Sequence, residues 1–236
     1  MIDFRSATFN AFVSFVFDHP AYEGQDLEVD GDRVVRVIEE RPRHWYWDVD
    51  WEWNCLPSDP GHVLALLTHL FTHAGALRGR FSPRQISQGF QLLLGSAAPG
   101  LFIGPIWSDQ LPWGAREKLV RATLPLYDDL FDRDVEIDYL PFMYWDLLLD
   151  HRYLDPRNAG PEAQDAARMR VVAADVIRSM ILDLNGAWSA PAGLHGAHHV
   201  NHPVAFAAVR KWLEDPGNSD EHYREYAQQV LDGVAI

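Results

Sequence analysis

A histidine cluster near residue 195 is the densest run of side chains that could do chemistry, and it holds His195, His198 and His199. A separation of four residues places His195 and His199 on one helical face, the spacing that two imidazoles need to share a metal ion. A helical metalloprotease motif also requires glutamate directly after the first histidine, and Gly196 stands there instead. We therefore expect a structural helix whose glycines, Gly193 and Gly196, admit a close neighbour while the imidazoles hydrogen-bond to backbone carbonyls. We predict no cofactor.

A second histidine pair with the same spacing is formed by His69 and His73. Two such pairs from different helices would make a metal site if they converged in space, and the protein would then be a metal-dependent hydrolase. In that alternative the ligand candidates are His195, His199, His69 and His73, with Asp146 or Asp150 completing the set. One sequence does not show such convergence, so the interpretation we favour for His69 and His73 is a polar helix edge.

Residues 44–54 depart furthest from average composition, because tryptophan and acidic residues alternate there. In an extended chain this alternation would place indoles on one face and carboxylates on the other. We expect Trp45 and Trp47 to be mostly buried against the helices after residue 58, and Trp51 and Trp53 to be the more exposed pair. The residues of the resulting binding site would be Asp48, Asp50, Trp51, Glu52 and Trp53. Three interpretations remain open: core packing, a partner surface, or a sugar site in which paired carboxylates act on a glycoside.

The charge of the chain limits its partners, because 34 acidic and 20 basic residues give a formal net charge of −14. Such a charge repels polyphosphates and anionic lipids, so we expect no nucleic acid and no membrane partner. Cys55 is the single cysteine, which excludes an internal disulfide and a multi-cysteine zinc site. The acidic run 128–138 lacks the glycine and the final carboxylate of a calcium loop. No segment is typical of a signal peptide or membrane span, and we expect a cytoplasmic protein.

Apolar periodicity and capping residues predict helices over most of the chain. Asp59-Pro60 and the capping box from Ser82 to Gln85 mark two helix starts, and Pro125 predicts a kink. The predicted helices span residues 6–18, 60–74, 83–94, 111–131, 139–151, 161–184, 191–200, 203–214 and 220–232. Asp30-Gly31 indicates a β-hairpin within 26–53, although 32–40 would also suit a helix.

Together these elements predict one mainly α domain over residues 1–236, built of antiparallel helix pairs in a HEAT-like stack or a helical bundle, with a small antiparallel β element near 26–53. Helix connections are short, and the segments 155–160 and 215–219 are too brief to separate domains. No sequence period establishes a regular repeat.

Several short motifs resemble a loosely defined group of uncharacterised bacterial proteins that are all-helical and HEAT-like. The motifs are Phe17-Asp18-His19-Pro20, Trp45-Tyr46-Trp47, Asp59-Pro60, Phe81-Ser82 with Gln85-Ile86 and Gln88-Gly89, and Leu194-His195-Gly196 with His198 and His199. They touch most of the chain in order. The resemblance implies a helical fold and carries no catalytic residue, because the group has no assigned reaction.

These observations lead to two functional hypotheses from different classes. The first is a non-enzymatic protein-interaction domain that holds a basic protein partner on an acidic helical surface, with the edge Trp51–Trp53 as its anchor. The alternative is a metal- or carbohydrate-dependent hydrolase that uses the histidine clusters or the row of tryptophans and carboxylates. The sequence leaves the oligomeric state open.

Overall fold

The computed structural model describes residues 5–20, 27–30, 33–37, 45–48, 59–95, 102–133, 137, 140–149 and 162–234. The elements within this part are α1 (Phe9–Phe17), β1 (Leu27–Asp30), β2 (Arg33–Val37), η1 (Trp45–Asp48), α3 (Pro60–Thr72), η2 (Ala74–Leu77), α4 (Pro83–Leu94), η3 (Gly104–Trp107), α5 (Trp113–Arg121), α6 (Thr123–Asp129), η4 (Phe131–Arg133), α7 (Tyr144–Leu148), α9 (Glu162–Leu182), α10 (Ser189–Val200), α11 (Pro203–Glu214) and α12 (Glu221–Asp232). The predicted mainly α fold is confirmed.

Local capping explains where several helices begin. The Asp59 carboxylate accepts hydrogen bonds from the Gly61 and His62 backbone N–H groups, and proline occupies the first turn of α3. At α4 the predicted capping box is present in full, because Ser82 and Gln85 each bond to the other's backbone N–H. These starts were predicted from residue type alone, because a cap depends only on neighbours within one turn.

The segment predicted as one kinked helix over 111–131 is two helices, α5 and α6, that meet at Ala122. Pro125 lies in the first turn of α6, where its missing N–H and its ring prevent the hydrogen-bond ladder from running straight through. The break follows from this proline, and both of the resulting helices pack between α3 and α9.

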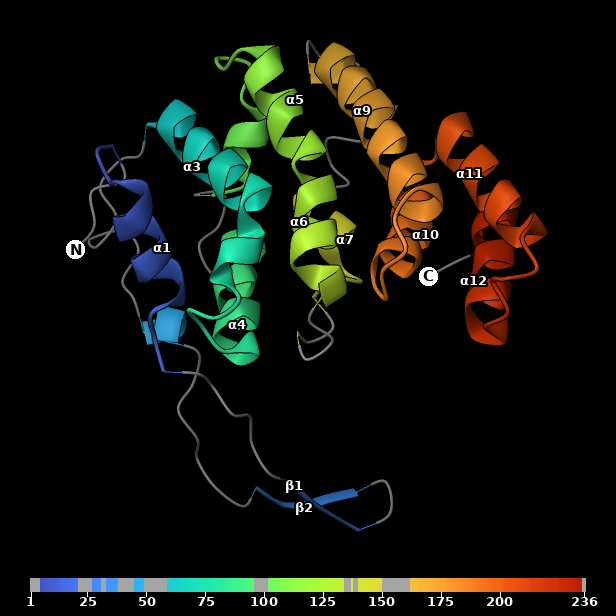
Figure 1. The fold of residues 1–236 in the computed structure, drawn as a ribbon, viewed down its shortest axis with the longest axis horizontal. Helices are drawn as coiled ribbons and strands as arrows, with labels where there is room; N and C mark the ends of the chain where they lie inside the picture. The colour runs from blue at the N-terminus through green and yellow to red at the C-terminus, as the bar shows by residue number, and fades with distance from the viewer. Residues whose placement is uncertain are drawn as a thin grey trace.

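The helices lie side by side in a curved row that runs from α1 to α12, as Figure 1 shows, and the β1–β2 hairpin lies apart from them. One continuous hydrophobic cluster extends from Phe12 in α1 to Val230 in α12. In the C-terminal half, α10 packs against α9, α7 and α12. No helix within the described residues combines the length and apolar character needed to cross a lipid bilayer.

The region of the tryptophan row differs from its prediction. β1 and β2 form the expected antiparallel hairpin, but the backbone of Trp45–Asp48 is a 3₁₀ turn and not the extended chain that the predicted alternation requires. Tyr46 is the buried residue of this turn, with 4% exposure, and its hydroxyl donates to Gln91 Oε1. Trp45 is half-buried and stacks on His19 at a centroid distance of 3.6 Å. Trp45 therefore contacts α1 and the residue His19 after it, whereas we had expected it to pack on the helices beyond residue 58.

Candidate metal centre

Three potential metal ligands meet between α7 and α10. Asp146 lies on α7, whereas His195 and His199 lie one turn apart on α10. His195 Nε2 is 2.5 Å from Asp146 Oδ2, and His199 Nε2 is 2.9 Å from Asp146 Oδ1. The two Nε2 atoms are 3.0 Å apart. In the described part of the chain, these residues are the one set of three or more histidine, cysteine or acidic side chains close enough to bind a common ion.

The contact between α7 and α10 depends on Gly196, the residue that stands where a metalloprotease helix would carry glutamate. A Cβ atom at this position would lie 2.4 Å from Cδ1 of Trp145, the fully buried neighbour of Asp146. A Cβ at Gly193 would lie 2.7 Å from Ile181 Cγ1 on α9. The expected role of these glycines in close helix approach is confirmed. The expectation that the imidazoles bond to backbone carbonyls is wrong for His195, whose two nitrogens contact the side chains of Asp146 and Tyr226.

The N-terminus of α10 is held by Asp132, which follows α6 in η4. One oxygen of its carboxylate, Oδ1, accepts hydrogen bonds from the backbone N–H groups of Trp188 and Ser189, at 2.8 and 2.9 Å. Burial raises the pKa of the Asp132 carboxyl, and these hydrogen bonds partly oppose that shift. A Cβ at Gly186 would overlap the same carboxylate. Asp132 belongs to the acidic run 128–138, but it is half-buried and holds the start of α10.

The three side chains are shielded from water to different degrees. The side-chain exposure is 6% for His195, 10% for His199 and 21% for Asp146. Burial alone would raise the pKa of Asp146, but hydrogen bonds from His195 and His199, together with their charge, outweigh it and hold the pKa well below its usual range. The carboxylate is therefore ionised at neutral pH and presents its charge to both imidazoles.

The opposite edge of the His195 ring faces the C-terminal helix α12. His195 Nδ1 is 2.6 Å from the Tyr226 hydroxyl, and Phe142 packs against the imidazole at a centroid distance of 4.6 Å. Sequence reasoning missed both residues. Tyr226 is 31 residues from His195 and shares no motif with it, so only the packing of α12 on α10 reveals the contact.

The distances suit one ion bound by three ligands. Ligand atoms that each lie about 2.0–2.2 Å from a single ion stand roughly 3 Å apart when their bonds to it are near a right angle, and roughly 3.4 Å apart around a tetrahedral zinc ion. Two of the three contacts have the first of these spacings and would open slightly around zinc. The 2.5 Å contact between His195 and Asp146 is a hydrogen bond, and it would have to open by about 0.5 Å to admit an ion.

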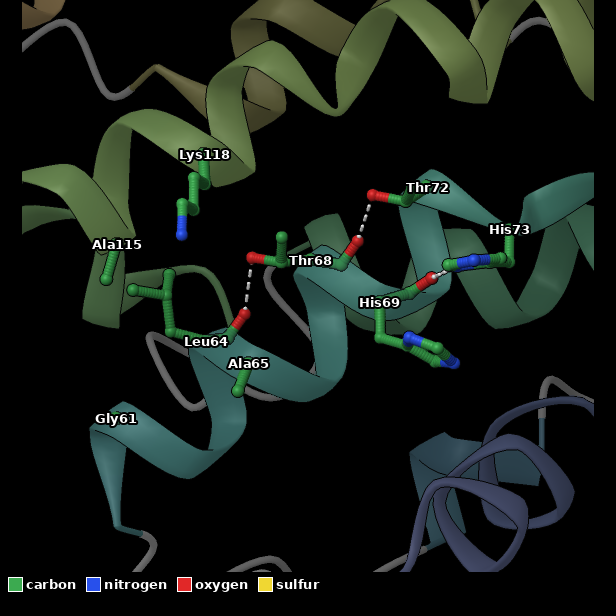
Figure 2. A pocket seen from close by; sticks show the side chains of 9 residues that line it. All are labelled: Gly61, Leu64, Ala65, Thr68, His69, Thr72, His73, Ala115 and Lys118. Carbon is green, nitrogen blue, oxygen red and sulfur yellow. Dashed lines mark hydrogen bonds between the residues drawn. The ribbon is translucent and has the colours of Figure 1, made fainter.

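The second predicted pair, His69 and His73, does not join this site. Both lie at the end of α3, where His73 Nδ1 hydrogen-bonds to the carbonyl oxygen of His69. Figure 2 shows them at one end of a groove of about 440 Å³ between α3 and α5, with Lys118 pointing toward α3 from the other wall. Among the described residues, none that lines the groove is acidic. The two pairs therefore do not converge, and the carboxylate comes from α7.

The remaining predicted residues lie wholly or partly outside the described part of the chain. Asp150 and the anchor residues Asp50, Trp51, Glu52 and Trp53 lie outside the described residues. So do the side chains of Trp47 and Asp48, whose backbone belongs to η1, and the predicted burial of Trp47 stays a prediction. The protein-interaction hypothesis, its basic partner and the sugar-site alternative therefore stay predictions.

Comparison with known proteins adds no further assignment. Neither models of protein families, nor curated proteins, nor solved structures gave a significant match to the chain. The resemblance to HEAT-like bacterial proteins stays a prediction. We therefore infer the function from the geometry of Asp146, His195 and His199.

Proposed function

We propose that the protein is a metal-dependent hydrolase that binds one divalent transition-metal ion through Asp146, His195 and His199. The observation that supports this is the convergence of two imidazole nitrogens and a carboxylate from two helices, with Nε2 atoms 3.0 Å apart. Imidazole and carboxylate ligands suit zinc and ferrous iron, and two histidines with one carboxylate are a known ligand set for both.

Within the described residues the centre has three protein ligands, a number that leaves a coordination position free for chemistry. Catalytic zinc sites keep a position for water, whose pKa falls to about 7 on the ion, so that hydroxide forms at neutral pH. Asp146 supplies one negative charge and the histidines bind as neutral imidazoles, so the loaded centre keeps a net positive charge toward its substrate. This arrangement favours hydrolysis of a carbonyl substrate over a purely structural site, which is usually closed by four protein ligands.

The charge of the whole protein narrows the substrate. A net charge of −14 repels polyanions such as nucleic acids and polyphosphates. Uncharged or cationic carboxylic esters and amides are therefore the substrate class we propose. Sugar hydrolysis by paired carboxylates receives no support from the described residues, because its candidate acids lie beyond them.

The first test measures metal content. The protein is expressed without a polyhistidine tag, purified without chelators, and analysed by inductively coupled plasma mass spectrometry. We expect close to one equivalent of zinc or iron in the wild type and in His73→Ala, and much less in His199→Ala and Asp146→Asn. The His73 variant is the matched control, because it removes an imidazole from the pair that meets no carboxylate. A wild-type protein that neither retains nor rebinds a metal would disprove the metal centre.

The second test measures reaction. Neutral esters, amides and phosphodiesters are offered to the purified, chelated and remetallated protein. Hydrolysis of esters or amides that disappears on chelation and returns with metal supports the proposal. A metal-loaded protein that hydrolyses none of them contradicts the hydrolase assignment and leaves only the metal centre.

A further inference from the structure

The Tyr226 hydroxyl contacts the one nitrogen of His195 that does not face Asp146. Nε2 of His195 points to the carboxylate on α7, and Nδ1 lies 2.6 Å from the hydroxyl on α12. The Tyr226 ring also runs nearly parallel to the imidazole, with 24° between the planes. His195 is thus held at both nitrogens by side chains from two different helices.

The hydrogen bond between Nδ1 of His195 and Tyr226 bears on whether Nε2 can offer a lone pair to a metal ion. A neutral imidazole that offers the Nε2 lone pair to a metal carries its hydrogen on Nδ1, and a buried N–H needs an acceptor. A tyrosine hydroxyl can accept this hydrogen bond, whereas a phenylalanine ring cannot. Phe142 covers the face of the ring, so the imidazole has little freedom to turn toward another acceptor.

The contact matters equally for α12, because few apolar side chains hold that helix in place. Only Ala227 and Val230 are fully buried among its residues. The packing partners of α12 are α10 and α11, and the Tyr226–His195 hydrogen bond is a direct polar link to α10. A metal ion bound at Nε2 would fix the His195 ring, and with it the Nδ1 atom that Tyr226 contacts from α12. Metal binding and the docking of α12 would therefore favour each other, since both depend on the same ring position.

We propose that Tyr226 is a positioning residue that holds His195 in its metal-binding orientation, and that metal occupancy stabilises the docked C-terminal helix α12. The inference rests on the proposed metal centre. It adds that the site is built from three helices, and that the last of them responds to the ion without contacting it. Outer partners of this kind change metal affinity by about 10–100-fold when removed.

The first experiment compares zinc affinity in Tyr226→Phe and Tyr223→Phe, measured by competition with a chromogenic chelator. Tyr223 is one turn earlier on the same helix, so its variant controls for loss of a tyrosine hydroxyl from α12. We expect zinc binding to weaken about 10–100-fold in Tyr226→Phe and to change less than about threefold in Tyr223→Phe. Equal affinity in wild type and Tyr226→Phe overturns the positioning role and leaves the proposed centre intact, whereas a wild type that binds no zinc overturns both.

The second experiment needs only the wild-type chain, so it tests the coupling to α12 and the orientation of His195 even where a variant does not fold. Backbone hydrogen exchange is followed with zinc and with a chelator, and ¹⁵N NMR reports the tautomer of His195. We expect slower exchange across residues 221–232 with zinc, and a hydrogen on Nδ1 in the loaded protein. Unchanged exchange in α12 overturns the coupling, and a loaded His195 bound through Nδ1 overturns the orientation.

Discussion

Two histidine pairs in this protein share one spacing and differ in everything around them. His195 and His199 are mostly buried on α10, whereas His69 and His73 are exposed on α3. The first pair faces a carboxylate from α7, and the second borders a groove whose described lining residues include Lys118 but no acidic residue. A separation of four residues on a helix therefore allows two histidines to bind one ion, but the two pairs differ in whether another helix brings a third ligand.

The largest expected difference between the pairs is in metal affinity. Asp146→Asn keeps the shape of the side chain and removes the anionic ligand, so we expect zinc affinity to fall at least ~100-fold, or about 2.8 kcal/mol. The double variant His69→Ala/His73→Ala should bind zinc as the wild type does, because neither residue reaches Asp146. Isothermal titration calorimetry measures both. A large loss in the double variant would mean that the ion binds at α3.

The close approach of α10 to α7 provides the next test. In Gly196→Ala the new methyl group would overlap the Trp145 indole, and we expect overpacking to cost about 2 kcal/mol of unfolding free energy and to weaken zinc binding. Gly114→Ala is the control, because no atom lies within 4 Å of a Cβ built there and the residue is in helix α5. Urea denaturation should show that variant to be as stable as the wild type or slightly more stable. Equal stability of both variants would refute the tight contact.

The cap on α10 contributes a smaller term. Asp132→Ala removes the acceptor for two backbone N–H groups at the start of the helix that carries His195, and we expect a loss of about 1.5 kcal/mol. Asp109→Ala, at an exposed position outside any helix, should change the free energy of unfolding by less than about 0.5 kcal/mol. Thermal and urea unfolding of both variants check this difference.

The smallest expected effect is a pH dependence that belongs to the first pair alone. The folded protein lowers the pKa of Asp146, so its contribution to stability is complete above the ordinary carboxyl value of about 3.9 and is lost as pH falls further. In chelator, the stability difference between wild type and Asp146→Asn should shrink by about 1 kcal/mol between pH 6 and pH 3, a figure reduced for partial exposure. A constant difference across this range would show that folding does not lower the pKa of Asp146.

Local signals predicted much of the fold. Local interactions within one or two turns determine the caps at Asp59 and Ser82 and the break near Pro125. Residue types in sequence order are therefore enough to predict them. The 3₁₀ turn at Trp45–Asp48 was missed because alternation suggests a strand only if the backbone is already extended. In the structure Tyr46 is buried and its hydroxyl donates to Gln91 on α4, a contact that the alternation of residue types does not reveal.

The site was predictable in part. The spacing of His195 and His199, and Asp146 as a possible third ligand, follow from the sequence, but their convergence depends on how α7 docks against α10. Tyr226 could not be found in this way, because it is brought to His195 by the packing of a helix 31 residues away. Both pairs have the same spacing, so the sequence contains no reason to prefer His195 and His199 over His69 and His73.

The contact between Gly196 and Trp145 also supplies an optical signal. Trp145 is fully buried, its indole N–H has no hydrogen-bond partner, and its chain neighbour is Asp146. An indole in such surroundings emits at the blue edge of tryptophan fluorescence, and a paramagnetic ion such as Co²⁺ or Cu²⁺ at the adjacent carboxylate quenches it. The difference spectrum between the wild type and Trp145→Phe isolates this emitter from the other tryptophans, so the protein carries its own fluorescent reporter of metal occupancy.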